Sequence, residues 1–174
     1  MSAIERANAF TLRGKQFTLV GPELKAGDRA PDFTVLDQTF SPVNLAATGN
    51  RVRLFSVVPS LDTGVCSAQT KRFNDEAVKF EDRVAFYTFS RDLPYAAKRW
   101  CADAGLTTVT TLHDHVDANF GRAYGAYVKE LGVDSRAVFV VDAGGVIRHV
   151  EYVLDMPDQP NYDAVIAALK KLVS

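Results

Sequence analysis

Cysteine is scarce in this sequence, and so is an excess of charge of either sign. The 174 residues include two cysteines, two methionines and one tryptophan, and the formal net charge is −1. Because there is no basic surplus, electrostatics give no reason to expect binding to nucleic acid or to an anionic membrane surface. No apolar run approaches the roughly 20 residues that a membrane-spanning helix needs. We therefore expect neither a nucleic acid nor a membrane among the partners.

Targeting and metal-binding motifs are missing as well. The first residues, MSAIER, lack the apolar core of a secretory signal peptide, so the cytoplasm is the expected compartment. A structural zinc site needs about four ligands at close spacing, and the sequence contains no Cys-x-x-Cys or Cys-x-x-His pair. His113, His115 and His149 include only one pair at strand spacing, and we do not expect them to hold a metal. Two cysteines in a reducing compartment are more often catalytic than structural.

The remaining composition is that of a folded protein. Hydrophobic residues make up 47% of the chain, which excludes a disordered chain. A length of 174 residues lies within the usual range for one domain with a substantial core. Since no linker, internal repeat or low-complexity segment interrupts the sequence, we expect residues 1–174 to form a single domain.

One stretch, residues 52–70, places a cysteine in a chemically favourable position. Apolar and β-branched residues from Val52 to Val58 predict a buried strand, which ends at Pro59 because proline cannot donate to a sheet. A helix is predicted to follow, reaching about Phe80, with Cys66 in its first turn. Free N–H groups and the helix dipole stabilise an anion there, so the position favours a thiolate. A lone cysteine is more often a small buried hydrophobic residue, but this context favours a reactive one.

The rest of the chain alternates between strands and helices. After an irregular start over residues 1–8, expected strands lie at 10–12, 17–20, 33–36, 42–45, 84–90, 109–112, 137–141 and 146–153. Expected helices lie at 94–104, 119–124 and 162–173. Ser90 or Asp92 is expected to cap the helix that begins at Pro94, and Asn161 to cap the last one. Parallel strands joined by helices, followed by an antiparallel pair, predict an α/β fold.

Three separated motifs resemble the bacterial thiol peroxidases, the atypical two-cysteine peroxiredoxins. Residues 59–66, PSLDTGVC, resemble the active-site loop of that family. Residues 90–101, SRDLPYAAKRWC, resemble the segment of its second cysteine, and residues 135–142, SRAVFVVD, its arginine-bearing strand. The resemblance extends over nearly the whole chain. It implies a thioredoxin-like fold, with the N-terminal hairpin as an added edge of the sheet.

The resemblance also implies a mechanism and its residues. Cys66 would attack a hydroperoxide and become a sulfenic acid, which Cys101 would convert to an intrachain disulfide. Arg136 and Thr63 would stabilise charge at the reacting oxygens, and Pro59 would shield the site from water. Hydrogen peroxide and organic hydroperoxides would be the substrates and thioredoxin the reductant, with no metal, flavin or haem. The family further implies a homodimer.

Other interpretations remain open when the residues are taken without the resemblance. Arg136 would then be a surface charge, Thr63 a turn residue, and Pro59 a strand stop. Cys101 would be a buried helix cysteine beside Trp100. Two other functions deserve comparison: a thiol–disulfide oxidoreductase of thioredoxin type, which would need two cysteines in one turn, and a redox sensor or chaperone-like protein whose disulfide controls a partner.

Overall fold

The computed structural model describes residues 3–174. The strands are β1 (Glu5–Leu12), β2 (Lys15–Val20), β3 (Thr34–Leu36), β4 (Pro42–Asn44), β5 (Val52–Val57), β6 (Val84–Ser90), β7 (Thr110–His113), β8 (Tyr127–Val128), β9 (Val133–Asp134), β10 (Ala137–Val141) and β11 (Ile147–Tyr152). The α-helices are α1 (Gly64–Phe80), α2 (Pro94–Ala104), α3 (Asn119–Ala123) and α4 (Tyr162–Val173), with short 3-10 turns at Ala46–Thr48 and Glu81–Arg83.

A seven-stranded mixed sheet runs through the molecule in the order β11-β10-β5-β6-β7-β3-β4. Strands β5, β6 and β7 are parallel, and the chain passes between them through α1 and α2. Strand β10 is antiparallel to both β5 and β11. The predicted α/β arrangement, with parallel strands first and an antiparallel pair last, is therefore confirmed.

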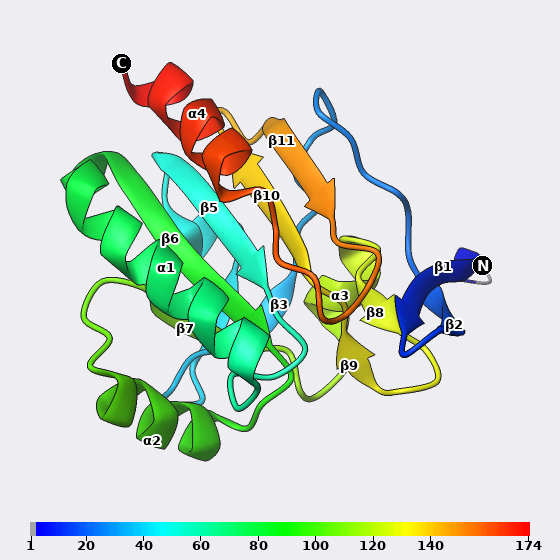
Figure 1. Cartoon of the computed structure of the whole chain (residues 1–174). Coiled ribbons are helices and arrows are strands. Elements are labelled where there is room, and N and C mark those ends of the chain that lie inside the picture. Colours follow the sequence, from blue (N-terminus) through cyan, green and yellow to red (C-terminus); the bar gives the residue numbers. More distant parts are fainter. Residues whose placement is uncertain (1–2) are drawn as a thin grey trace.

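Hydrophobic layers cover both faces of this sheet. Helices α1 and α4 lie side by side on one face (Figure 1), where Phe73 and Leu169 pack with Leu54 of β5. The next residue of β5, Phe55, points to the opposite face and packs there with Phe120 of α3. This alternation is what a strand buried on both faces requires, because successive side chains point to opposite sides. The sheet therefore holds α1, and with it Cys66, in a fixed position.

The N-terminal hairpin belongs to a second sheet, not to the edge of the first. Strands β1 and β2 continue into β8 and β9 in the order β1-β2-β8-β9 (Figure 1). The expectation of an added edge on the central sheet is therefore wrong. The expectation of an irregular start is also wrong from Glu5 onward, while Met1 and Ser2 lie outside the described residues. Strands β8 and β9 were not predicted, since two residues each carry no readable alternation.

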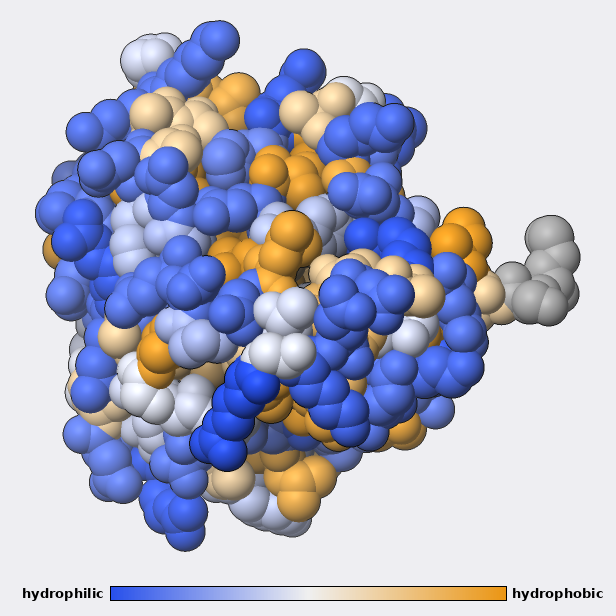
Figure 2. All heavy atoms as spheres, turned by 45° about the vertical axis from the view of Figure 1, so that its right-hand side comes forward, coloured by the Kyte–Doolittle hydropathy of each residue, from blue (hydrophilic) through white to orange (hydrophobic). Residues whose placement is uncertain are grey.

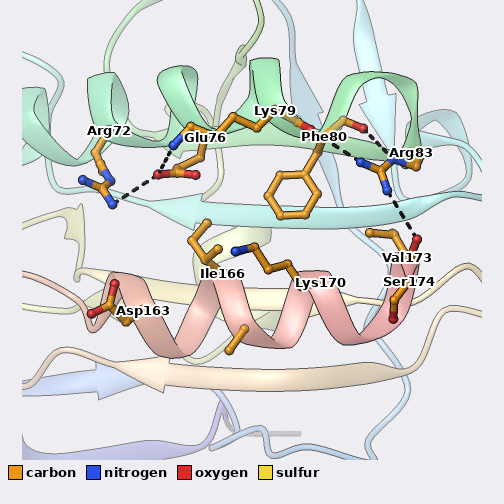
Figure 3. A pocket seen from close by; sticks show the side chains of 11 residues that line it. Arg72, Glu76, Lys79, Phe80, Arg83, Asp163, Ile166, Lys170, Val173 and Ser174 are labelled. Carbon is orange, nitrogen blue, oxygen red and sulfur yellow. Dashed lines mark hydrogen bonds and ion pairs between the residues drawn. The ribbon is translucent and has the colours of Figure 1, made fainter.

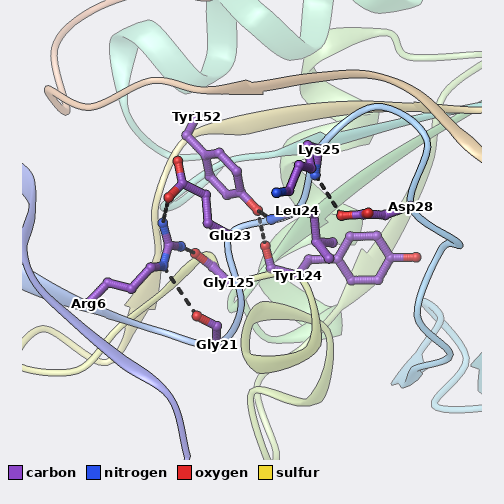
Figure 4. Close-up of polar contacts among 9 residues, drawn as sticks. All are labelled: Arg6, Gly21, Glu23, Leu24, Lys25, Asp28, Tyr124, Gly125 and Tyr152. Atoms are coloured by element: carbon purple, nitrogen blue, oxygen red, sulfur yellow. Dashed lines mark hydrogen bonds and ion pairs between the residues drawn. The ribbon is translucent and has the colours of Figure 1, made fainter.

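Arg6 connects this hairpin to the rest of the molecule (Figure 4). Its Nε donates to the carbonyl oxygen of Gly21 at 3.2 Å, and a second nitrogen donates to that of Gly125. Its guanidinium lies over the ring of Tyr152, 5.2 Å from the ring centroid, and the Tyr152 hydroxyl donates to Tyr124 O at 2.7 Å. The hairpin is thus tied to β11 and to the segment after α3.

Among residues 3–174, no helix has the length and apolar character to cross a membrane.

Candidate active site

Cys66 is the third residue of α1, directly after the end of β5 and a short loop. Thr63, in an extended conformation, precedes the helix as its N-cap residue. The Cys66 side chain is only 1% exposed and packs with Val58, Leu61 and Ala97. The predicted position in the first helical turn is confirmed. The helix N-terminus favours an anion at this sulfur, and the apolar enclosure strengthens the attraction of that anion to a nearby positive charge.

That positive charge comes from Arg136, the residue before β10. Its side chain is 1% exposed, and its NH2 group donates to Cys66 Sγ at 3.5 Å and to Met156 O at 3.1 Å. Because β10 pairs with β5, a residue at the start of β10 lies beside the loop that follows β5. Arg136 is therefore not a surface charge. Its guanidinium offers donors to the sulfur and to an oxygen bound next to it.

Gln69 fixes the orientation of that guanidinium, and it was not among the residues predicted for the site. It lies three residues after Cys66 on α1, hence on the same helix face. Its Oε1 accepts from Arg136 NH1 at 2.7 Å, and its Nε2 donates to Ser56 Oγ at 2.8 Å. The side chain is completely buried. A long polar side chain three positions after the cysteine, on the same helix face, was the signal that could have pointed to it.

The two remaining loop residues lie close to the cysteine in sequence but differ in exposure. Pro59 is buried at the end of β5. Thr63 is exposed, and its hydroxyl donates to the carbonyl oxygen of Ser60 at 3.4 Å. A contact of that length is weak, so it does not hold the hydroxyl in one orientation.

Cys101 lies on α2 and faces different neighbours from those of Cys66. Its Sγ accepts from Gln38 Nε2 at 3.6 Å and donates to Thr111 Oγ1 at 3.9 Å, on the side of β7. Burial raises the pKa of the Cys101 thiol, and its hydrogen bonds with Thr111 and Gln38 offset this only in part. Both cysteines are free thiols. The Cys101 thiol is therefore held as a neutral group, with Gln38 and Thr111 as its hydrogen-bond partners.

Comparisons with known proteins identify the family of this chain. The family model described as Redoxin matches residues 25–166. The chain belongs to the Redoxin family. It is 50% identical to the thiol peroxidase of Bacillus subtilis, over 94% of this chain and 97% of that protein. It is 51% identical to the thiol peroxidase of Halalkalibacterium halodurans, over 93% of this chain and 97% of that protein.

Solved structures share the fold of this Redoxin chain. A peroxiredoxin-like protein from Aquifex aeolicus, 35% identical, superposes with a TM-score of 0.88 over 96% of this chain and 98% of that one. The thiol peroxidase from Chromobacterium violaceum superposes with a TM-score of 0.83 over 93% of this chain and 95% of that one; at 19% identity it supports the fold alone. The thioredoxin-like fold is confirmed. The chain is a thiol-dependent peroxidase of the peroxiredoxin type.

Asp92 of this peroxidase does not cap a helix, contrary to the prediction from the sequence, but binds the loop before Cys66. The N-cap residue of α2 is Leu93, which has no polar side chain, so neither Ser90 nor Asp92 caps this helix. The Asp92 carboxylate instead accepts from Ser60 Oγ at 2.7 Å, from Leu61 N at 2.7 Å and from Ser90 Oγ at 2.8 Å. The carboxylate therefore binds the active-site loop and not the N-terminus of α2.

Other polar sites of the peroxidase lie apart from the two cysteines. A groove of about 700 Å³ runs between α1 and α4 (Figure 3), where Glu76 pairs with Arg72 at 3.1 Å and with Lys79 at 3.0 Å. Its lining contains neither cysteine.

Within the described residues, no group of three or more His, Cys, Asp or Glu side chains is placed to hold a metal ion. Burial lowers the pKa of His113, which keeps its imidazole neutral.

Proposed function

We propose that Cys66 carries the peroxidase chemistry of this chain. Its thiolate attacks one oxygen of a hydroperoxide, the O–O bond breaks, and the second oxygen leaves with the electron pair as hydroxide or alkoxide. Taking up a proton makes that leaving group water or an alcohol. The sulfur is oxidised by two electrons to a sulfenic acid, and the peroxide is reduced by two. Hydrogen peroxide and organic hydroperoxides are the proposed substrates.

The contact between Arg136 and the Cys66 sulfur, 3.5 Å long, is the observation that carries this proposal. A fixed guanidinium attracts the thiolate before the reaction. It also attracts the negative charge that develops on the departing oxygen, which is present mainly in the transition state. Gln69 holds the guanidinium in place, so little reorganisation is needed. We assign the Thr63 hydroxyl to bind the peroxide, and Pro59 to keep water from the sulfur.

Cys101 is the proposed resolving cysteine. Its thiol loses a proton, and the thiolate attacks the sulfur of the Cys66 sulfenic acid. The S–O bond breaks as the S–S bond forms, and the oxygen leaves as water after taking up a proton. The disulfide requires Cα atoms within about 7 Å, and Cys101 Sγ must first leave Gln38 and Thr111. We therefore propose that the first turn of α1, the α2 segment, or both move on oxidation. The dithiol of thioredoxin would then reduce the disulfide by exchange and become oxidised itself.

Peroxide consumption with thioredoxin, its reductase and NADPH tests this assignment. Cys66→Ser should abolish turnover, because an alcohol is scarcely ionised at neutral pH. Cys101→Ser should consume about one equivalent of peroxide and then stop as a sulfenic acid, detectable with a dimedone-type trap. Full thioredoxin-coupled turnover by Cys101→Ser would contradict its resolving role. Less than one equivalent per wild-type chain would favour a sensor over a peroxidase.

We further propose that residues 1–174 form one domain, that the peroxidase is a homodimer and that it works in the cytoplasm. Thioredoxin-dependent recycling supports a reducing compartment. Large hydrophobic residues exposed at the start of α2 support a protein interface. Leu93 is 55% and Tyr95 76% exposed, and the ring centroids of Tyr95 and Phe40 lie 5.1 Å apart. On the face in Figure 2, hydrophobic residues occur in small groups among hydrophilic ones. Sedimentation of wild type and Tyr95→Glu tests the dimer, which the charge should dissociate.

A further inference from the structure

We propose that Asp92 is a positioning residue that couples the loop before Cys66 to the helix that carries Cys101. Its hydrogen bonds join the loop before Cys66 to the segment that leads into α2. One carboxylate oxygen accepts from Ser60 Oγ at 2.7 Å, and the other accepts from Leu61 N at 2.7 Å. Both donors belong to the loop between β5 and α1, whereas Asp92 stands two residues before Pro94, the first residue of α2.

The contacts around Asp92 make this connection specific. Ser90 Oγ donates to the same oxygen as Leu61 N, at 2.8 Å, so the carboxylate has three donors from two segments. The Leu61 side chain, 1% exposed, packs with Cys66 and with Ala97 of α2. The backbone of Leu61 is thus held by Asp92 while its side chain fills the space beside the sulfur. A shift of the Asp92 carboxylate would displace Leu61 and loosen the first turn of α1.

The coupling has opposite effects on the two steps of catalysis, and here the inference rests on the proposed function. While the carboxylate is bound, Cys66 stays beside Arg136, in the position in which it reacts with peroxide. To form the disulfide, the loop and the α2 segment must move relative to each other, and the hydrogen bonds of Asp92 must break. Asp92 therefore favours the peroxide step and opposes the disulfide step.

The expected size of the effect follows from the bonds that are lost. A hydrogen bond to a carboxylate is strong enough for its loss to change an equilibrium constant by about tenfold or more. Asp92→Asn keeps the shape of the side chain but replaces one accepting oxygen by an NH2 group. We expect sulfenic acid formation to slow by about tenfold and the following disulfide formation to accelerate by about tenfold.

Two rapid-mixing measurements test this. Sulfenic acid formation is measured in a Cys101→Ser background, where no disulfide can follow, by acid quenching of the reaction. Disulfide formation is measured in chains with both cysteines, by Trp100 fluorescence and by acid quenching. Asp103→Asn is the matched control, because Asp103 is an exposed aspartate on α2; it should leave both rates unchanged. Ser60→Ala removes one of the same hydrogen bonds, so it should shift both rates in the same directions. In the double variant Ser60→Ala with Asp92→Asn, the change in each rate should be smaller than the sum of the two single changes in free energy of activation.

Opposite changes in the two rates are the result that supports coupling, since general destabilisation would not separate them. Equal slowing of both steps, with a lowered melting temperature, would show that Asp92 only stabilises the fold. Unchanged rates in Asp92→Asn, with turnover still dependent on Cys66, would overturn the coupling and leave the proposed function intact. Turnover that survives Cys66→Ser would instead overturn the proposed function.

Discussion

Arg136→Met separates the charge beside the sulfur from the space that it fills. Methionine retains an unbranched apolar stem but removes the guanidinium and its donors. Those donors now reach Cys66 Sγ at 3.5 Å, Gln69 Oε1 at 2.7 Å and Met156 O at 3.1 Å. The side chain is 1% exposed, so water cannot readily replace the lost group. The substitution thus takes a fixed positive charge away from the reacting atoms.

The size of the loss can be worked from the 3.5 Å contact. Opposite unit charges at that distance attract by about 5 kcal/mol at an effective dielectric constant of about 20. This figure is an upper bound, because the helix N-terminus and Gln69 remain. Removing one preorganised donor from an oxyanion site typically slows a reaction by about 10² to 10³-fold. We expect the second-order rate constant for Cys66 oxidation at pH 7 to fall by about that factor.

The assay is stopped-flow oxidation in a Cys101→Ser background at pH 7 and pH 10. At pH 10 an ordinary thiol is largely ionised, so any deficit that remains there lies in the transition state and not in the thiolate fraction. Arg53→Met is the matched control, since Arg53 is also buried, at 3% exposure, and donates to Gly49 O at 2.9 Å and Asp142 O at 2.7 Å. It should lower stability and leave the oxidation rate close to that of wild type.

Three results would refute parts of this reasoning. Wild-type rates for Arg136→Met at both pH values would exclude the arginine from the chemistry. Recovery at pH 10 alone would leave it only the role of favouring the thiolate. An equal loss in Arg53→Met would mean that removing any buried arginine has this effect, so that proximity to Cys66 is not the cause.

Three further predictions concern the disulfide, its pH dependence and the hairpin. Oxidised protein should run as a monomer on a non-reducing denaturing gel, and a covalent dimer as the main product would contradict an intrachain bridge. Burial raises the pKa of the Cys101 thiol above its ordinary value of 9.0, and the attacking form is the thiolate. Disulfide formation should therefore still accelerate above pH 9, and a plateau below that pH would contradict this. Arg6→Ala removes the donors to Gly21 O and Gly125 O. It should lower the free energy of unfolding in urea by about 1–3 kcal/mol; an unchanged value would mean that Arg6 does not hold the hairpin.

Local sequence patterns determined the main elements and the place of Cys66. The apolar run of β5, the break at Pro59 and the following helix put Cys66 in the first turn of α1, where the structure has it. Asn161 caps α4 through a hydrogen bond from Ala164 N, and Gly105 ends α2 in a left-handed conformation. These features depend on residues within a few positions of one another, so periodicity and capping rules are sufficient to find them.

Only the tertiary structure decided which polar groups meet. The N-terminal hairpin lies outside the central sheet because Leu19 of β2 pairs with Val128 of β8. Strand β8 has two residues, and no local sequence pattern predicts it. Asp92 bonds to a loop more than 30 positions earlier instead of capping the helix next to it. Arg136 lies 70 positions from Cys66, and strand pairing, not sequence spacing, brings it to the sulfur. A carboxylate or guanidinium takes the partners that folding places within hydrogen-bond reach, and local propensity does not encode that distance.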